Sequence, residues 1–299
     1  MNGIRDVFFK YKTEALMLLP VFLYLTGFLV MIFYYLLSLS LTYVAPDFTV
    51  TFPSLTNYHA LFANRDFLVA LLHTLVFVIV GTPLELAAGL VLAMLVYRNF
   101  PMRGIVRSIF IIPLAVPAMV TAIILLQLFE YPGGHINTLL MGKHAVMPAI
   151  MEMPVNWRDS AASSLGISLI GKVWRDMPIS MLILLAGLNA ITQDQYAAAE
   201  TMGANERQKF RFITLPLLLP AISTVLIIRS IEMWKEFIFP YFLARRYHLL
   251  GTLIEYLYHD WNKKGEAAAV SVILVACIVC SAVLLFWVLR TVRVRLVRV

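Results

Sequence analysis

The sequence predicts an all-α polytopic membrane protein with six transmembrane helices, both termini inside the cell, and a short cytoplasmic helix between the fourth and fifth crossings. Hydrophobic residues make up 61% of the 299-residue chain, and its mean hydropathy is +0.83. An ordinary soluble domain has roughly 45–50% apolar residues. Apolar runs of bilayer-spanning length also recur along the chain. Finally, the basic residues fall unevenly between these runs, which indicates their orientation.

Six runs reach the length of about 20 residues that a helix needs to cross the hydrocarbon core. They lie near residues 14–42, 67–97, 104–129, 166–192, 213–241 and 267–290. The first exceeds the 7–15 residues of a cleavable signal sequence, so it is expected to remain as an anchor helix. We find no internal repeat or linker, which predicts a single transmembrane domain over 1–299, with an anchor helix at 14–42 and core helices within 67–290.

The Lys and Arg residues favour an inside position for both termini, because positive residues near short loops stay in the cytoplasm. The larger group is then cytoplasmic: Arg5, Lys10, Lys12, Arg98, Arg103, Arg107, Arg207, Lys209, Arg211, Arg290, Arg293, Arg295 and Arg298. The net charge of +7 therefore reflects topology and contact with anionic membrane lipids. It does not indicate a nucleic-acid partner.

Charged residues inside the crossings are a second signal, because each costs a few kcal/mol at the bilayer centre unless it faces protein or water. The charges of the fourth and fifth crossings are Lys172, Arg175, Asp176, Arg229, Glu232, Lys235 and Glu236. Helical spacing pairs Lys172 with Asp176 and puts residues 229, 232 and 236 on one face. Two hypotheses explain them: a polar substrate path open to the outside, or structural ion pairs that lock the fourth crossing to the fifth.

The sequence shows no catalytic or metal-binding motif, which predicts that the chain is not an enzyme. The Gly-Lys pairs at 142–143 and 171–172 lack the spacing and hydroxyl of a nucleotide-binding loop. Cys277 and Cys280 lie within an apolar run and are expected to pack there. An alternative function is an ion-coupled secondary transporter that uses the intramembrane charges as a relay. Such carriers usually have an internal repeat and more helices.

The stretch AAAETMGANERQKFRFITLP, residues 197–216, carries charge and small side chains between two apolar runs. The predicted topology places it in the cytoplasm. Ala198, Ala199, Gly203 and Ala204 would give its helix a side with almost no bulk. A surface helix gains nothing from such a side unless a groove on another protein closes over it.

This stretch resembles the signature of inner-membrane permease subunits of binding-protein-dependent ABC importers, in the maltose-type carbohydrate branch. The signature is E-A-A, three residues, Gly, nine residues, Ile, one residue and Leu-Pro. Ala197 stands at the Glu position, and Glu200, one turn later, is a candidate to replace its contact. Segments such as RSIFIIPLAVPAMV and VWRDMPISMLILLAGLNAI extend the resemblance over most of the chain, to the first of the two permeases such importers use.

The resemblance implies two groups of functional residues. The first lies in and after a coupling loop at 193–212 and docks the ATPase: Ala198, Ala199, Glu200, Gly203, Ala204, Ile213, Leu215 and Pro216. The second, together with the charged face above, lines the substrate pathway: Lys172, Arg175, Asp176, Ile179, Arg229, Glu232, Met233 and Glu236.

The resemblance also implies the partners and the location. A chain of this family works in the cell inner membrane by alternating access. Its partners are a second homologous permease, a dimer of ATP-binding cassette ATPases, an extracytoplasmic solute-binding protein, and a sugar or polyol ligand. ATP and Mg would bind the ATPase, so no cofactor is expected on this chain.

Overall fold

The computed structural model describes residues 12–143 and 148–297, and nearly all of its regular structure is helical. Arg5, Lys10 and Arg298, assigned above to the cytoplasmic side, lie outside the described residues. The elements in chain order are α2 (Lys12–Ser40), β1 (Tyr43–Val44), β2 (Val50–Thr51), α3 (Thr56–Ala63), α4 (Arg65–Tyr97), α5 (Arg103–Ala115), α6 (Ala118–Leu128), α7 (His135–Leu140), α8 (Ala161–Asn189), α9 (Gln193–Thr201), α10 (Glu206–Lys209), a π-helical turn (Phe210–Thr214), α11 (Leu215–Trp234), α12 (Ile238–Leu243), α13 (Leu250–Glu255), a second π-helical turn (Tyr256–Asp260) and α14 (Lys264–Val297).

Four helical stretches of the described chain are long and apolar enough to cross a membrane: Leu16–Ser40, Arg65–Tyr97, Glu206–Leu243 and Lys264–Thr291. The bent pair α5 and α6 makes a fifth if it is counted as one crossing. The remaining predicted crossing corresponds to α8, which has 29 residues but carries Lys172, Arg175 and Asp176 close together. The prediction of a multi-helix membrane protein is confirmed at this coarser level.

The third predicted crossing, 104–129, is not one straight helix. α5 and α6 meet at an angle of 89°. Val116, at the break, is extended, with φ −81° and ψ 127°. Its successor Pro117 explains this geometry, because a proline ring pushes the preceding residue out of the helical region. The sequence contained the proline, but the size of the bend depends on how α6 packs afterwards.

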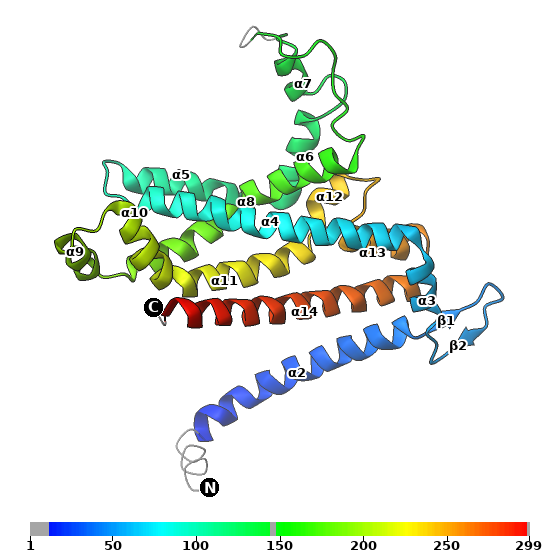
Figure 1. Ribbon diagram of the computed structural model, residues 1–299. Helices are drawn as coiled ribbons and strands as arrows, with labels where there is room; N and C mark the ends of the chain where they lie inside the picture. Colours follow the sequence, from blue (N-terminus) through cyan, green and yellow to red (C-terminus); the bar gives the residue numbers. More distant parts are fainter. Residues whose placement is uncertain (1–11, 144–147, 298–299) are drawn as a thin grey trace.

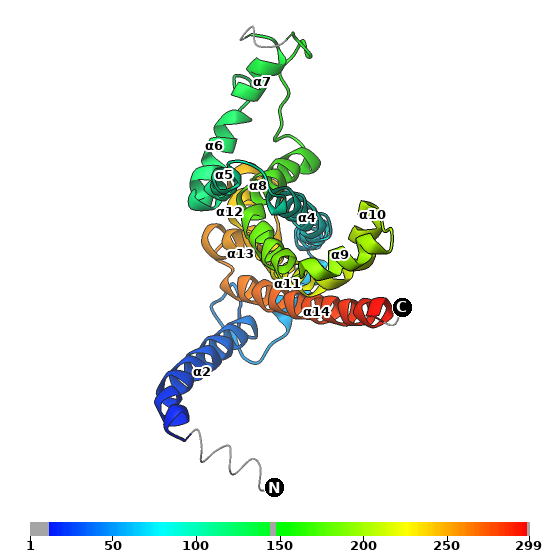
Figure 2. The same ribbon diagram turned by 90° about the vertical axis from the view of Figure 1, so that its left-hand side faces the viewer.

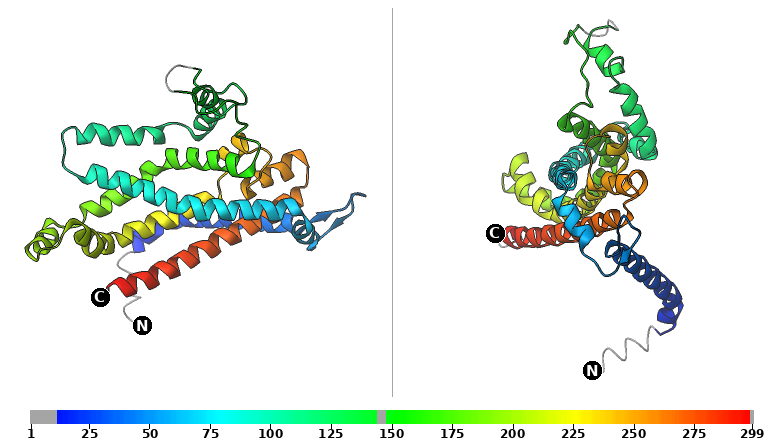
Figure 3. Two further views of the ribbon diagram at one scale, coloured as in Figure 1. Left: turned by 45° about the horizontal axis from the view of Figure 1, so that its top comes forward. Right: turned by 90° about the vertical axis from the view of Figure 1, so that its right-hand side faces the viewer.

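The long helices lie side by side, and both ends of the bundle can be recognised in Figures 1 and 3. α9 and α10 lie at the same end as the start of α2 and the end of α14. The hairpin β1–β2, α3 and α13 lie at the opposite end. α2 contacts α14 but diverges from the rest of the bundle, as Figure 2 shows. This arrangement places the coupling loop beside the two ends predicted to be cytoplasmic.

A close contact between α4 and α8 holds the centre of the bundle. Gly89 of α4 faces Ser180 of α8, and a Cβ atom on Gly89 would lie 2.6 Å from the Ser180 Cβ. Small residues let helix backbones approach closely in membranes, where van der Waals packing replaces the hydrophobic effect. Around this contact, Met181, Leu184 and Leu218 join α8 and α11 in a buried apolar cluster. The bundle core therefore depends on a glycine at this position.

We expect Gly89→Ala to destabilise the chain by about 1–3 kcal/mol, because the added methyl group has no room between the two helices. Gly166→Ala in α8 is the matched control, since a Cβ there meets nothing within 4 Å. The thermal unfolding midpoint of detergent-purified protein measures both effects. Equal midpoints for the two variants would contradict the proposed contact.

Candidate functional site

Lys172 of α8 contacts three carboxylates. Its Nζ lies 2.6 Å from Asp176 Oδ2, 3.1 Å from Glu236 Oε2 and 3.9 Å from Glu232 Oε2. Asp176 is one turn further along α8, whereas the two glutamates are in and just after α11. The side chain of Lys172 is only 8% exposed. One buried cation thus connects α8 to the end of α11.

Arg229 of α11 is the second buried cation, with a side chain 1% exposed. Its Nη1 lies 2.9 Å from Glu232 Oε2 and 3.9 Å from Asp176 Oδ2. Its Nε lies 3.6 Å from Oε2 of Glu85 in α4. Arg229 therefore brings carboxylates of three helices together.

Arg175 and Glu236 extend these contacts to two short elements. Arg175 Nη1 lies 2.5 Å from Asp176 Oδ1, and its Nε donates a hydrogen bond of 3.4 Å to the Val116 carbonyl at the α5–α6 bend. Glu236 Oε1 accepts a hydrogen bond of 3.1 Å from the backbone N–H of Phe239 in α12. We call the connected group the ion network: Glu85, Lys172, Arg175, Asp176, Arg229, Glu232 and Glu236.

Glu85 is the member that sequence reasoning missed. Its side chain is fully buried, and neither carboxylate oxygen has a hydrogen-bond partner among the described residues. The signal was present, because Glu85 is the only Asp, Glu, Lys or Arg between Asp66 and Arg98. An isolated carboxylate within an apolar run faces protein or water. Helical spacing identifies charges that lie three or four residues apart, so it does not identify a single charged residue such as Glu85.

Exposure divides the predicted substrate-pathway residues into two sets. Lys172, Asp176, Arg229, Met233 and Glu236 are buried within the chain's own helices. The side chains of Arg175 and Glu232 are 26% and 29% exposed, and Ile179 is partly exposed. The four buried charges have the geometry of structural ion pairs, whereas Met233 belongs to the apolar core. The second set presents atoms to the surface of the bundle, where a ligand could contact them.

The coupling loop forms two helices, α9 and α10, where we expected one short cytoplasmic helix. α9 ends at Thr201, and Gly203 follows with φ +77°. The N–H of Ala204 donates to the Ala199 carbonyl, which closes the helix end. Glycine adopts this left-handed conformation without the penalty that a Cβ imposes. α10 then starts after Asn205, whose side chain caps the Gln208 N–H at 2.9 Å.

The predicted docking residues do not share one face. Ala198 and Gly203 are exposed, Ala204 is partly exposed, and Ala199 is only 4% exposed. Ile213 and Leu215 pack against the apolar cluster of α4, α8 and α11, and Pro216 is partly buried in α11. The exposed residues are free to meet a partner, while the buried ones attach the loop to the bundle.

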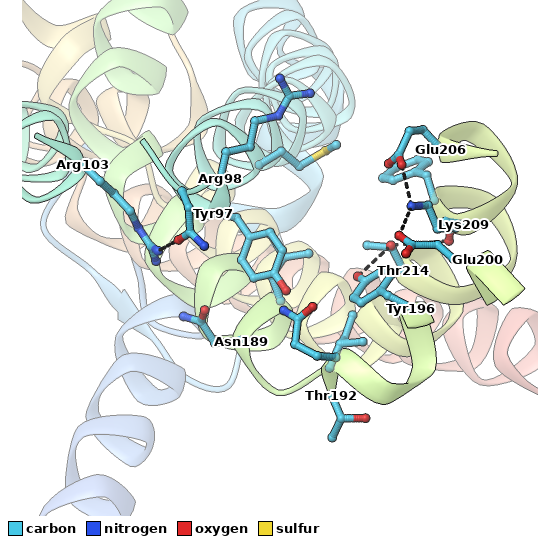
Figure 4. A pocket seen from close by; sticks show the side chains of 16 residues that line it. Tyr97, Arg98, Arg103, Asn189, Thr192, Tyr196, Glu200, Glu206, Lys209 and Thr214 are labelled. Carbon is cyan, nitrogen blue, oxygen red and sulfur yellow. Dashed lines mark hydrogen bonds and ion pairs between the residues drawn. The ribbon is translucent and has the colours of Figure 1, made fainter. Parts of the chain in front are cut away.

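Lys209 fastens the two helices of the coupling loop together. Its Nζ lies 2.7 Å from Glu200 Oε1 in α9 and 2.5 Å from Glu206 Oε1 in α10. Figure 4 shows these three side chains beside Tyr196 and Thr214, whose hydroxyl groups are 3.0 Å apart. Glu200, considered above as a replacement for the signature glutamate, is thus engaged within its own chain.

Comparison with known proteins covers both the ion network and the coupling loop. Residues 85–297 match the family described as "Binding-protein-dependent transport system inner membrane component". The chain is 32% identical over 226 residues to the trehalose/maltose transport system permease protein MalF of Thermococcus litoralis, with 74% of each chain covered. It is 32% identical to the probable ABC transporter permease protein y4oQ of Sinorhizobium fredii, with 94% of this chain and 88% of that protein covered. In fold, it matches a chain of a bacterial alginate ABC transporter, solved in complex with an alginate pentasaccharide-bound periplasmic protein. The TM-score is 0.80 at 18% identity, with 96% of this chain and 97% of that chain covered.

We expect Lys172→Met to destabilise the chain by about 3–5 kcal/mol, because it leaves buried Asp176 and Glu236 without their shared cation. Lys235→Met is the matched control, since Lys235 is exposed and has no ion pair among the described residues. Thermal unfolding in detergent measures both variants. An unchanged midpoint for Lys172→Met would show that these contacts do not hold the bundle.

Proposed function

The chain belongs to the family of binding-protein-dependent transport system inner membrane components, and from this premise we propose that it forms half of the translocation pathway of an ATP-driven importer for a sugar or related polyol. The observation that carries the proposal is the coupling loop, which combines the family signature with exposed small residues at one end of the bundle. The permease named for trehalose and maltose supports the ligand class. The family match does not favour an ion-coupled carrier.

The buried charges and the distribution of Lys and Arg support a topology. We infer six crossings within one domain, with α8 and the bent pair α5–α6 as two of them and both termini inside. α8 can cross because Lys172 and Asp176 are buried and pair with each other and with charges in and just after α11, away from lipid. The coupling loop then lies in the cytoplasm, within reach of an ATPase.

Energy would come from partners. The sequence shows no nucleotide-binding loop, so ATP and Mg belong on a separate ATPase dimer, and this chain needs no cofactor of its own. A second homologous permease would complete the pathway. A solute-binding protein would deliver the ligand outside the cell, and the alginate transporter solved with its periplasmic protein is a precedent for that contact.

The ligand would contact the partly exposed side chains of Arg175, Ile179 and Glu232. Charged groups form strong hydrogen bonds to hydroxyl groups, which suits a sugar or polyol. The buried members of the ion network would hold these side chains in place. During alternating access, movement of the coupling loop would reach the ligand through α11, which follows the loop directly and carries Glu232.

Ala198→Trp tests the docking role. We expect ATP-driven uptake of trehalose or maltose by proteoliposomes holding the complete transporter to fall at least tenfold, because a bulky side chain at the centre of an interface disrupts its packing. ATP hydrolysis by the transporter should continue without uptake. Ala198→Ser keeps the side chain small and should behave as wild type. Wild-type uptake by the tryptophan variant would argue against docking through this residue.

Glu232→Gln tests the ligand contact. We expect the KM for uptake to rise about tenfold through loss of a charge-assisted hydrogen bond. The unfolding midpoint should fall as well, because Arg229 loses its nearest carboxylate, although the glutamine carbonyl can still accept a hydrogen bond from it. Asp176→Asn, at the buried centre of the ion network, should lower the midpoint further and leave KM nearly unchanged. If Glu232→Gln lowers the midpoint and leaves KM unchanged, Glu232 belongs to the structural set.

A further inference from the structure

A cavity of about 780 Å³ opens between the coupling loop and the core of the bundle. Its walls come from the end of α4 and the start of α5 on one side, and from the end of α8, α9 and α10 on the other. Figure 4 shows Tyr97 between Arg98 and Arg103 on one side and Tyr196 on the other. The volume lies within the range of about 300–1,000 Å³ typical of small-molecule sites. Neither the ion network nor the docking residues account for this cavity as a whole.

The two walls differ in charge. Arg98 and Arg103 line the α4–α5 wall, and neither guanidinium group lies within ion-pair distance of a carboxylate in the part of the chain that the structure describes. Among the described residues, the Arg103 guanidinium donates a hydrogen bond to the Asn99 side chain, at 3.1 Å. On the opposite wall, Lys209 pairs with both Glu200 and Glu206, and these three side chains together carry one net negative charge. The cavity therefore has one wall with uncompensated positive charge.

The rest of the lining offers hydrogen bonds to hydroxyl groups. Asn189 and Gln193 contribute side-chain amides, and Tyr97 and Tyr196 contribute phenol groups with aromatic faces. Arg is well matched to phosphate, because its planar guanidinium can donate two parallel hydrogen bonds to phosphate oxygens. An anion attracted to the α4–α5 wall would extend its remaining groups toward the amides and phenols.

We propose that this cavity binds a hydroxyl-rich phosphate ester, with the phosphate at the α4–α5 wall that carries Arg98 and Arg103. Two sources share this chemistry: a soluble sugar phosphate and the headgroup of a phospholipid such as phosphatidylglycerol. A ligand that touches both walls would brace α9 and α10 against α4. Its access from the cytoplasm rests on the proposed topology, but binding itself does not.

The test uses the complete purified transporter and two probes. Glucose 6-phosphate binding is followed by ³¹P NMR line broadening in detergent. Phosphatidylglycerol binding is followed by the unfolding midpoint in phosphatidylcholine nanodiscs with and without that lipid. The double variant Arg98→Gln, Arg103→Gln removes the charge, and the double lysine variant restores it. Arg107→Gln is the control, because Arg107 is an exposed residue of α5 that does not line the cavity.

We expect at least one probe to bind the wild type and Arg107→Gln equally, and the glutamine variant at least tenfold more weakly, with partial recovery in the lysine variant. Added salt should weaken binding, as screening requires. Response to glucose 6-phosphate identifies a soluble ligand, and response to phosphatidylglycerol alone identifies a lipid. The proposal is overturned if neither probe acts on the wild type, or if the glutamine variant responds like it. Neither measurement involves transport, so failure of this site leaves the importer function standing, and absence of ATP-driven uptake would not affect the binding result.

Discussion

Burying a charged side chain away from water costs free energy, and the bundle is stable only if its buried charges are paired. Removing one partner of a buried ion pair is strongly destabilising, because the remaining charge has no compensation. Lys172 and Arg229 meet this constraint by sharing the carboxylates of Asp176 and Glu232. These shared contacts fix the positions of α8 and α11, and through Arg175 also the bend between α5 and α6. Positions that look unrelated in the sequence are therefore set by one requirement.

Glu85 is the least satisfied member of this arrangement. The contact between its Oε2 and Arg229 Nε is 3.6 Å, and Arg229 Nε is itself without a hydrogen bond among the described residues. The stronger partner of Arg229 is Glu232, at 2.9 Å. Arg229 thus has one close carboxylate that is partly exposed and one more distant carboxylate that is fully buried.

Local features of the site were predictable from the sequence. Spacing alone predicted the pairing of Lys172 with Asp176 and placed Arg229 and Glu232 on one helical face, and the structure shows a contact within each pair. The contact from Lys172 to Glu236 joins two helices and depends on their packing, which spacing does not encode. The same limit applies to the fold: hydropathy located the helical regions, but it did not show the 89° bend or the break at Gly203. Both depend on backbone angles at single residues.

The Lys209 contacts have a mechanical consequence. Without these contacts, the coupling loop would bend at Gly203 when α9 was displaced, and little of the displacement would reach α11. The Lys209 ammonium group instead links α9 and α10 across Gly203, through its ion pairs with Glu200 and Glu206. The coupling loop would then move as one rigid unit with α11, so that a displacement of α9 and α10 would be transmitted along α11.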